Sequence, residues 1–430
     1  MDEDTKPKNP MVPRYSFGIC GSTGSDPRYN PGTVLREPMA QAIVRVLNAG
    51  SRPTPALAAA ATELAAEIAT QTVSPNTQTH DGNEVADGDN DPADFAVALV
   101  RVKDLRAICQ HDGDWHIDFP LLTAADQANL AANLDPFAAD LAATVMAAAP
   151  RIDALLTKAA WTRPLPEIRL AAVGCFGLDW AGLALLAKSN LIHHGHDYPD
   201  GGRFTIMGGE RSAATRPDKL YCSSHTGHGE QYCFTGFGDN AGPRLGLPDL
   251  LWRLGLAQKL DRTPLSPPLA RGLATLVRAQ TPAWLDAAGQ LCAGETPPSS
   301  NTNPPAIGEL LSSLGYWSPD GGSNLQLYRA SHWPVLQPTL AQLSQLMDNW
   351  LKDNYDGILA AAADTSPARN GIDPAMFFVD LWHDVFGRAN QALAEGGWLH
   401  DPQPPTTGEA RYLTWCAEKE LYSLMQAASV

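Results

Sequence analysis

The sequence has few charged residues for its length, and most of the charges are negative. Charged residues make up 18% of the 430 residues, and 47 acidic side chains outnumber 31 basic ones; soluble domains typically reach ~25%. No run of Lys and Arg supplies the positive surface that nucleic-acid binding needs, or a basic amphipathic segment for an anionic membrane. We therefore predict that the chain binds neither nucleic acid nor membranes. The many Ala, Gly, Ser, Thr and Pro residues leave surface for a protein partner.

The sequence also lacks a disulfide framework and a secretory signal. Its seven cysteines form no pattern of close pairs, which favours a reducing compartment. The first ten residues are polar and contain no apolar core. The stretch 170–187 is apolar and long enough to span a membrane, but Asp179 near its middle and the interrupting glycines favour a buried strand that runs into a buried helix. The prediction is a soluble, cytoplasmic protein.

No complete enzyme motif and no internal repeat occurs, so the fold prediction depends on hydrophobic patterning. Strands are predicted at 14–20, 95–102 and 167–176, and a hairpin at 106–119 around an Asp-Gly turn. Helices are predicted at 37–47, 55–72, 123–160 with a start at Asp135-Pro136, 179–189, 247–260, 268–280, 338–363, 373–395 and 408–427. These elements predict a mixed, helix-rich α/β fold, in which a sheet-containing body precedes an α-helical C-terminal region.

Composition shifts divide the chain into five parts. The segment 73–93 is rich in Asp and Asn and is predicted to be an acidic mobile loop. The segment 294–305 is rich in Pro, Ser, Thr and Asn and is predicted to be a linker. The predicted parts are therefore a strand–loop–helix region at 1–72 packed on the body, the loop 73–93, an α/β body at 94–293, the linker 294–305, and a mostly helical region at 306–430.

Residues 190–239 concentrate the side chains that could carry chemistry. Five of the 11 histidines lie there with two cysteines, and imidazole and thiolate are ligands of borderline metals. Cys222, His225, His228 and Cys233 are spaced as a hairpin with one cysteine on each arm and the histidines on the loop. Two thiolates and two imidazoles make a closed, structural zinc site. The alternative is a plain hairpin whose cysteines pack as small apolar residues.

A second histidine cluster reads HHGHD at 193–197. It resembles the HxHxDH signature of metallo-β-lactamase-type hydrolases, and Gly201-Gly202 follows as the glycines of that family do. The resemblance implies a zinc-dependent hydrolase, in which Asp197 orients a histidine. The last histidine of the signature is missing, however, because 198–200 reads YPD. The alternative is that these histidines cap the C-terminus of the preceding helix.

A third interpretation takes His228-Gly229 as a catalytic pair. The segment DKLYCSSHTGHG resembles caspase-like peptidases, in which the catalytic His precedes a Gly at the end of a strand. The resemblance implies a cysteine nucleophile downstream, and Cys292 is the cysteine at a workable distance. Its surroundings, LDAAGQLCAGE, are typical of a helix rather than a strand, and no histidine can be placed beside it from the sequence.

The sequence therefore favours a soluble protein-interaction or regulatory protein with a structural metal site. The alternative is a hydrolase that uses the same histidines, either zinc-dependent or caspase-like. A closed site with four ligands favours the first function, whereas an open site beside an acid or base with a perturbed pKa favours the second.

Overall fold

The computed structural model describes residues 14–24, 26–35, 37–72, 95–193, 195–211, 221–239, 282–295, 311–312, 316–318, 322–402 and 411–428. The acidic segment predicted at 73–93 and the helices predicted at 247–260 and 268–280 lie outside the described residues, as do all but the first two residues of the linker. Within the described chain, sheets and many helices are mixed, and the predicted α/β class is confirmed.

The first sheet joins the N-terminal strand to the histidine-rich window. Its strands are β1 (Arg14–Ser22), β5 (Leu121–Leu122), β6 (His196–Asp197) and β7 (Arg203–Arg211). β1 pairs antiparallel with β7 along its whole length, and β5 runs parallel on the other side of β7. The strand predicted at 14–20 is confirmed, and β6 extends the sheet by pairing with the start of β7.

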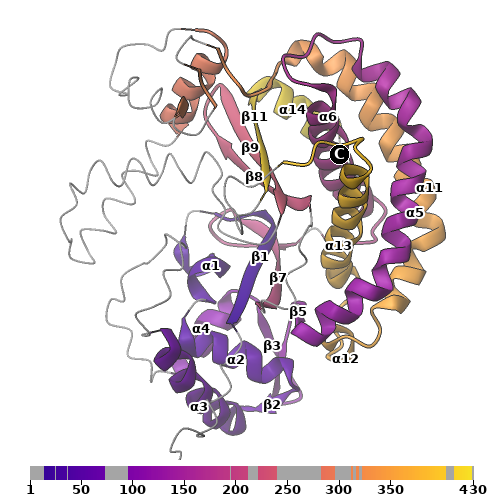
Figure 1. Cartoon of the computed structure of the whole chain (residues 1–430). Helices are drawn as coiled ribbons and strands as arrows, with labels where there is room; N and C mark the ends of the chain where they lie inside the picture. The colour runs from indigo at the N-terminus through magenta and orange to yellow at the C-terminus, as the bar shows by residue number, and fades with distance from the viewer. Residues whose placement is uncertain are drawn as a thin grey trace, which may run out of the picture.

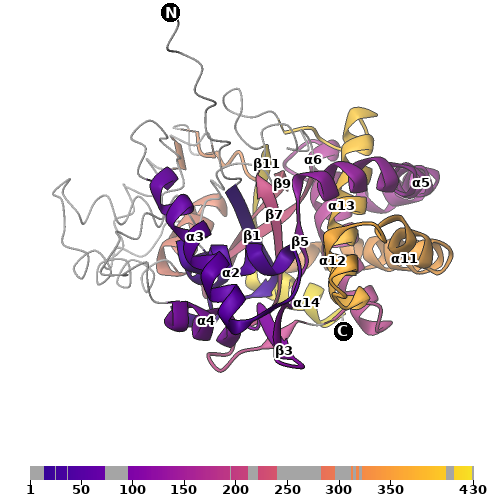
Figure 2. The same cartoon turned by 90° about the horizontal axis from the view of Figure 1, so that it is seen from below.

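A small second sheet and four helices flank β1. The sheet contains β2 (Arg52–Pro53), β3 (Ile108–His111) and β4 (Asp114–Ile117), and the helices are α1 (Pro31–Val34), α2 (Pro38–Asn48), α3 (Thr54–Thr72) and α4 (Phe95–Asp104). The Asp112-Gly113 turn has positive φ at both residues, as a type I′ turn requires, so the predicted hairpin is confirmed. Seen from below, α2, α3 and α4 lie on one side of the strands (Figure 2).

The strand predicted at 95–102 is wrong, because this segment forms helix α4. Its β-branched residues suggested a strand, but its burial follows the helical period. Ala98 and Val102, four residues apart, are buried, whereas Val97 and Val100 are 52% and 56% exposed. The apolar stripe of a helix repeats every three to four residues. In α4 this stripe contains only two buried residues, Ala98 and Val102.

Three long helices stand side by side on the other side of the strands (Figure 1). They are α5 (Ala124–Leu156), α11 (Trp333–Ala361) and α13 (Pro374–Glu395). α5 begins at a capping box of Thr123 and Asp126 and continues through Pro136, so the start predicted at Asp135-Pro136 is wrong. Its buried stripe runs on from Leu134 to Leu141, which shows that packing outweighs the hydrogen bond lost at the proline.

The strand predicted at 167–176 is also wrong. The segment is helical throughout: α6 (Leu165–Arg169), the π-helix η2 (Leu170–Ala181) and α7 (Gly182–Lys188) follow one another without a break. A short apolar run that is buried on all sides cannot be assigned to strand or helix from its periodicity, and η2 is buried at every position except Trp180. The helix 165–188 is apolar enough to cross a membrane, but 78% of its most apolar window is buried inside the protein, as in the core of a soluble protein.

A third sheet combines strands from distant parts of the chain. In the order β10-β11-β9-β8 it contains β10 (Leu327–Tyr328), β11 (Tyr412–Glu418), β9 (Tyr232–Asp239) and β8 (Tyr221–His228). The helix predicted at 408–427 is therefore wrong over β11, and helix α14 (Lys419–Ala428) begins only after it. The physical reason is that Trp415 and Cys416 are both fully buried on opposite faces, so the strand shows no polar face.

The two faces of this sheet pack against different cores. On the inner face, the Trp415 ring lies 5.5 Å from Phe176 of η2. On the outer face, Tyr232 and Phe234 join a smaller core with Leu285 from a helix at 282–292. All eight residues of β9 are buried as a result. We call the part of the protein built on this smaller core, with the helix at 282–292, the outer lobe. The outer lobe and the π-helix η2 thus pack on opposite faces of the strands that carry the predicted zinc ligands.

The carboxyl of Asp179 allows the burial of the π-helix η2 to be tested. It is 2% exposed, and its Oδ2 has no hydrogen-bond partner. Burial raises the pKa of this carboxyl to about 7, although a hydrogen bond with Ser224 opposes the shift. Because the folded protein keeps this proton to a higher pH than the unfolded chain, stability should fall as pH rises from about 4 to about 7.

We expect Asp179→Asn to remove this pH dependence. In urea denaturation the variant should gain on the order of 2–4 kcal/mol relative to the native protein between pH 5 and pH 8. Asp348→Asn, which removes a carboxylate from a surface pair with Lys352, serves as the control and should change the pH profile little. Parallel profiles for the native protein and Asp179→Asn would show that Asp179 is ionised in the folded protein.

Candidate functional site

The predicted zinc ligands lie on a β-hairpin, and the hairpin itself is confirmed. The turn occupies 229–231, so both histidines lie within β8 rather than on the loop. His228 is opposite Cys233, and His225 is opposite Gly236. Cys222 is the extra residue of a bulge at the far end of the hairpin, next to the pair of Ser223 with Gly238.

The hairpin brings only two of the four predicted ligands into contact. The His228 Nδ1 and the Cys233 Sγ are 3.3 Å apart. Five residue pairs separate Cys222 from Cys233, and at about 3.4 Å per residue this distance is roughly 17 Å. Among the described residues, no group of three or more His, Cys, Asp or Glu side chains is placed to share a metal ion. Zinc binding stays a prediction that this arrangement of the four side chains does not support.

The cysteines near the hairpin do not have the properties of a nucleophile. Cys233 is fully buried, and burial raises the pKa of its thiol to about 11 although Lys419 opposes the shift. Burial likewise raises the pKa of the Cys292 thiol to about 11. Burial and Lys419 lower the pKa of His228, so this imidazole is neutral. A cysteine nucleophile needs a lowered pKa, and the caspase-like interpretation therefore has no reactive thiol here.

The second histidine cluster lies elsewhere and is built differently. His194 lies outside the described residues, and His193 and His196 each contact a partner far away in the sequence. The His193 Nε2 lies 2.9 Å from the Asp373 Oδ2, and the His193 backbone N–H donates to the carbonyl of Ala375. Neither histidine is oriented by Asp197, which pairs with Arg203 at 3.4 Å. The cluster is therefore not a helix cap but a contact between two chain segments.

Asp373 is held in place by its own helix. It is the N-cap of α13, and its Oδ1 accepts a hydrogen bond from the Ala375 N–H at 2.8 Å. Partial burial raises the pKa of Asp373, but the hydrogen bonds from His193 and the Ala375 N–H outweigh it and keep the pKa below its usual value. Asp373 is thus a fixed carboxylate with one oxygen on the helix and the other on the imidazole.

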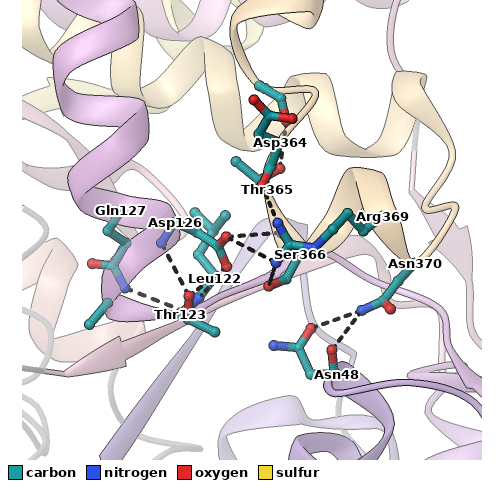
Figure 3. A network of polar contacts seen from close by, with 12 residues as sticks. Asn48, Leu122, Thr123, Asp126, Gln127, Asp364, Thr365, Ser366, Arg369 and Asn370 are labelled. Carbon is teal, nitrogen blue, oxygen red and sulfur yellow. Dashed lines mark hydrogen bonds and ion pairs between the residues drawn. The ribbon is translucent and has the colours of Figure 1, made fainter.

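The segment before Asp373 is anchored at two points (Figure 3). Asp126, buried at the start of α5, accepts hydrogen bonds from the Ser366 N–H at 2.9 Å and from the Thr123 N–H and hydroxyl at 2.8 and 2.7 Å. Asn370 donates to the carbonyl of Asn48, at the end of α2, at 2.9 Å. These bonds connect the three-helix layer to the N-terminal helices and fix the loop that presents Asp373.

His196 has a different partner and an unused donor. The Arg106 Nη1 lies 3.3 Å from the His196 Nδ1, and because the guanidinium can only donate, Nδ1 accepts and Nε2 carries the proton. Burial, Arg106 and His193 lower the pKa of His196, so the imidazole is neutral. Its Nε2 is buried and has no hydrogen-bond partner. The site therefore holds a buried N–H group without an acceptor, which native structures generally avoid.

Arg106 occupies a backbone position that favours glycine. Its φ is +55°, and the Arg106 and Ala107 N–H groups bond back to the carbonyls of Lys103 and Val102, the pattern that ends a helix in a Schellman motif. Gly371 and Gly397 occupy the same position in two other helix ends of this chain. A non-glycine residue here costs on the order of 1 kcal/mol. The long side chain at this position, which reaches His196, is thus present despite local strain.

Two further side chains complete the site. The Tyr198 hydroxyl donates to the Leu105 carbonyl at 2.8 Å and supports the turn that carries Arg106. Asp118 is half-buried, and burial raises the pKa of its carboxyl although Arg106 opposes the shift. Four separate segments therefore contribute two contacting pairs, Arg106 with His196 and His193 with Asp373, and a carboxyl, Asp118, whose pKa both Arg106 and Asp373 influence.

Sequence reasoning singled out the cluster HHGHD at 193–197, which contains both histidines of this site, but missed the other three residues. Arg106 was missed because α4 was taken for a strand, so no helix end was expected there. Asp373 was predicted to start a helix, but nothing in the sequence connects it to His193, 180 residues away. A helix assignment for 95–104 would have exposed the unusual Arg at its C-terminus.

No protein-family model, curated protein or solved structure matches the chain. The chemistry of the site is therefore inferred from its own geometry.

The strain at Arg106 gives a stability prediction. We expect Arg106→Gly to raise the free energy of unfolding by up to about 1 kcal/mol, because glycine adopts φ +55° without cost. Urea denaturation at pH 7 measures the change. Arg106→Ala is the matched variant, since it removes the same side chain but keeps the strain, and should not be stabilised. A clear loss of stability in Arg106→Gly would mean that the guanidinium stabilises the fold rather than serving the site.

Metal analysis tests the hairpin. We expect Cys222→Ser to leave the zinc content of the purified protein unchanged, because Cys222 is remote from the contact between His228 and Cys233. Elemental analysis of the native protein, Cys222→Ser and Cys233→Ser gives the comparison. Stoichiometric zinc that is lost in both variants would instead show that Cys222 and Cys233 converge in the metal-bound protein.

Proposed function

We propose that the protein is a hydrolase that acts by general acid–base catalysis at His193, Asp373, His196, Arg106 and Asp118. The observation that carries the proposal is the pairing of His193 with a fixed carboxylate beside a second, neutral histidine whose N–H has no acceptor. The substrate class is a small ester that carries negative charge near its reacting carbonyl or phosphoryl group.

His193 has the arrangement of a general base. Its Nε2–H donates to Asp373, so Nδ1 is the basic nitrogen and faces away from the carboxylate. A carboxylate in this position fixes the tautomer and stabilises the imidazolium that forms on proton transfer. Both side chains are 52% exposed, which gives a water molecule access to the base.

His196 and Arg106 suit the stabilisation of developing negative charge. The neutral His196 offers a buried Nε2–H donor that no protein group uses. The adjacent guanidinium adds a permanent positive charge 3.3 Å from the same ring. Fixed donors in a partly desolvated site stabilise an oxyanion strongly, and because the His196 Nε2 is buried, a substrate oxygen reaches it only after neighbouring side chains move.

The proposed step balances as a simple hydrolysis. His193 takes one proton from water as the water oxygen bonds to the carbonyl carbon, and the carbonyl electron pair moves onto oxygen beside His196 and Arg106. The ester C–O bond then breaks, and the leaving alkoxide takes a proton from Asp118, whose raised pKa favours the acid form. A proton passed through solvent from His193 to Asp118 restores both groups.

The function favoured by the sequence, a protein-interaction or regulatory protein with a structural zinc site, stays a prediction. It depends on a closed site of four ligands, whereas His193 and Asp373 of the second cluster are half-exposed and the pKa of nearby Asp118 is raised by burial. Such an open site is the feature that favours a hydrolase. A protein partner, the cytoplasmic location and the absence of nucleic-acid or membrane binding are likewise untested predictions.

We expect His193→Asn to lower kcat/KM by ~10²–10⁴-fold, the usual contribution of a general base. The assay is release of p-nitrophenol from p-nitrophenyl acetate, p-nitrophenyl succinate and p-nitrophenyl phosphate. Asp373→Asn should lower kcat with little change in KM, because it misorients the base without removing it. Because Asp373→Asn keeps an N-cap side chain, helix α13 should remain folded.

His111→Asn is the matched control. His111 also pairs with an aspartate, Asp112, at 3.0 Å, but on an exposed hairpin turn. The control should keep full activity. No turnover of any of the three esters above the buffer rate, or equal activity in the His193→Asn and native proteins, would refute the proposed function.

A further inference from the structure

A cavity of about 340 Å³ lies between the outer lobe and the main body. Its walls come from the end of the helix at 282–292, from the chain before and after β10, and from the segment after α5. This volume is within the range of pockets that hold small molecules, and such pockets often lie between lobes. None of its lining residues belongs to the site proposed for hydrolysis, so the cavity raises a separate question of what it binds.

Two side-chain acceptors that line the cavity, Gln326 and Ser323, are already engaged. The Gln326 Oε1 accepts from the Thr162 N–H and hydroxyl at 3.1 and 3.0 Å and from the Arg163 N–H at 3.3 Å. The Ser323 hydroxyl bonds to the backbone of Leu325. A ligand that mainly donates hydrogen bonds would therefore find these two side chains already occupied.

The donors, in contrast, have capacity left. Arg329 uses Nη1 for Glu418 at 3.2 Å, and among the described residues its other N–H groups have no side-chain partner. The His332 Nδ1 accepts from the Arg329 N–H at 3.0 Å, so Nε2 carries the proton. Burial and Arg329 lower the pKa of His332, which keeps the ring a neutral donor. Arg329 and His332, which both line the cavity, thus carry N–H groups that are not used by the bonds described above.

The rest of the wall is apolar. It consists of small and aliphatic side chains and a protonated thiol: Ala160, Leu291, Cys292, Ala293, Leu325 and Leu327. An apolar wall with convergent polar groups at one end is typical of a site for an amphipathic small molecule. The apolar wall favours a ligand with a hydrocarbon or aromatic part, and the hydrogen-bond donors favour a ligand with an anionic head group.

We propose that this cavity binds a small organic carboxylate. A carboxylate matches the fork of a guanidinium and can accept from His332 with the same head group. Glu418 already balances the charge of Arg329, so a monoanion introduces one uncompensated charge whereas a phosphate dianion introduces two. The carboxylate end would lie at Arg329 and His332, and the apolar body against Leu291 and Leu325.

Isothermal titration calorimetry of the full chain tests this proposal. The probes are benzoate, hexanoate and indole-3-acetate, each compared with its uncharged amide, and inorganic phosphate. We expect at least one carboxylate to bind, with its amide and phosphate at least about tenfold weaker, since a charged hydrogen bond accounts for roughly that factor. Failure of all three carboxylates at 10 mM (roughly the weakest binding worth assigning), or equal binding of phosphate or of the amides, would overturn the proposal.

Two variants locate the binding. Arg329→Gln should weaken the carboxylate at least about tenfold. Ala293→Trp should abolish binding by filling the cavity while it leaves the Arg329–Glu418 pair intact, so its result does not depend on the fate of that pair. Arg28→Gln, at an exposed arginine, is the matched control and should bind normally. Unchanged binding in Ala293→Trp would place the ligand elsewhere. Because the readout is binding, its outcome is independent of hydrolytic activity.

Discussion

Burial of the π-helix η2 at every position except Trp180 is the constraint on which the rest of the structure depends. Glycines in η2 and at the start of α7 allow neighbours to approach closely: a Cβ at Gly177 would lie 2.6 Å from the Leu343 side chain, and one at Gly182 would lie 2.9 Å from Trp382. The Trp382 indole in turn donates to the Leu178 carbonyl at 3.0 Å. Helices α11 and α13 and the third sheet are therefore placed by contacts to one apolar segment (Figure 1), and π-helical segments are often found at functional sites.

The proposed active site depends on this arrangement indirectly. The chain leaves α7, the continuation of η2, and reaches His193 within five residues, while α13 packs against η2 and presents Asp373 at its N-terminus. The His193–Asp373 contact thus joins the ends of two elements that the core already holds together. Arg106 lies just after helix α4, in the N-terminal part of the chain. Its strained backbone accompanies the contact of its guanidinium with His196.

Local signals were sufficient where one face of an element is exposed or a turn has special chemistry. The helices near 37–47, 55–72 and 373–395 and the Asp-Gly hairpin were predicted because caps, periodicity and turn residues agree with the tertiary structure. Two of the failures share one cause, which does not apply to α4 or to the helix start expected at Asp135-Pro136. The segment 167–176 and β11 are buried on both sides, so their sequences lack the alternation that separates helix from strand.

For the candidate site, the sequence alone determined that imidazole chemistry is concentrated in 190–239, that the chain is acidic, and that β8 and β9 form a hairpin. Only the tertiary structure decided which histidines meet charged partners. Residue spacing placed Cys222 with Cys233, but the register of the strands separates them. It gave no reason to connect His193 with Asp373, because a contact between residues 180 positions apart is set by the packing of α13 and η2, not by any local pattern.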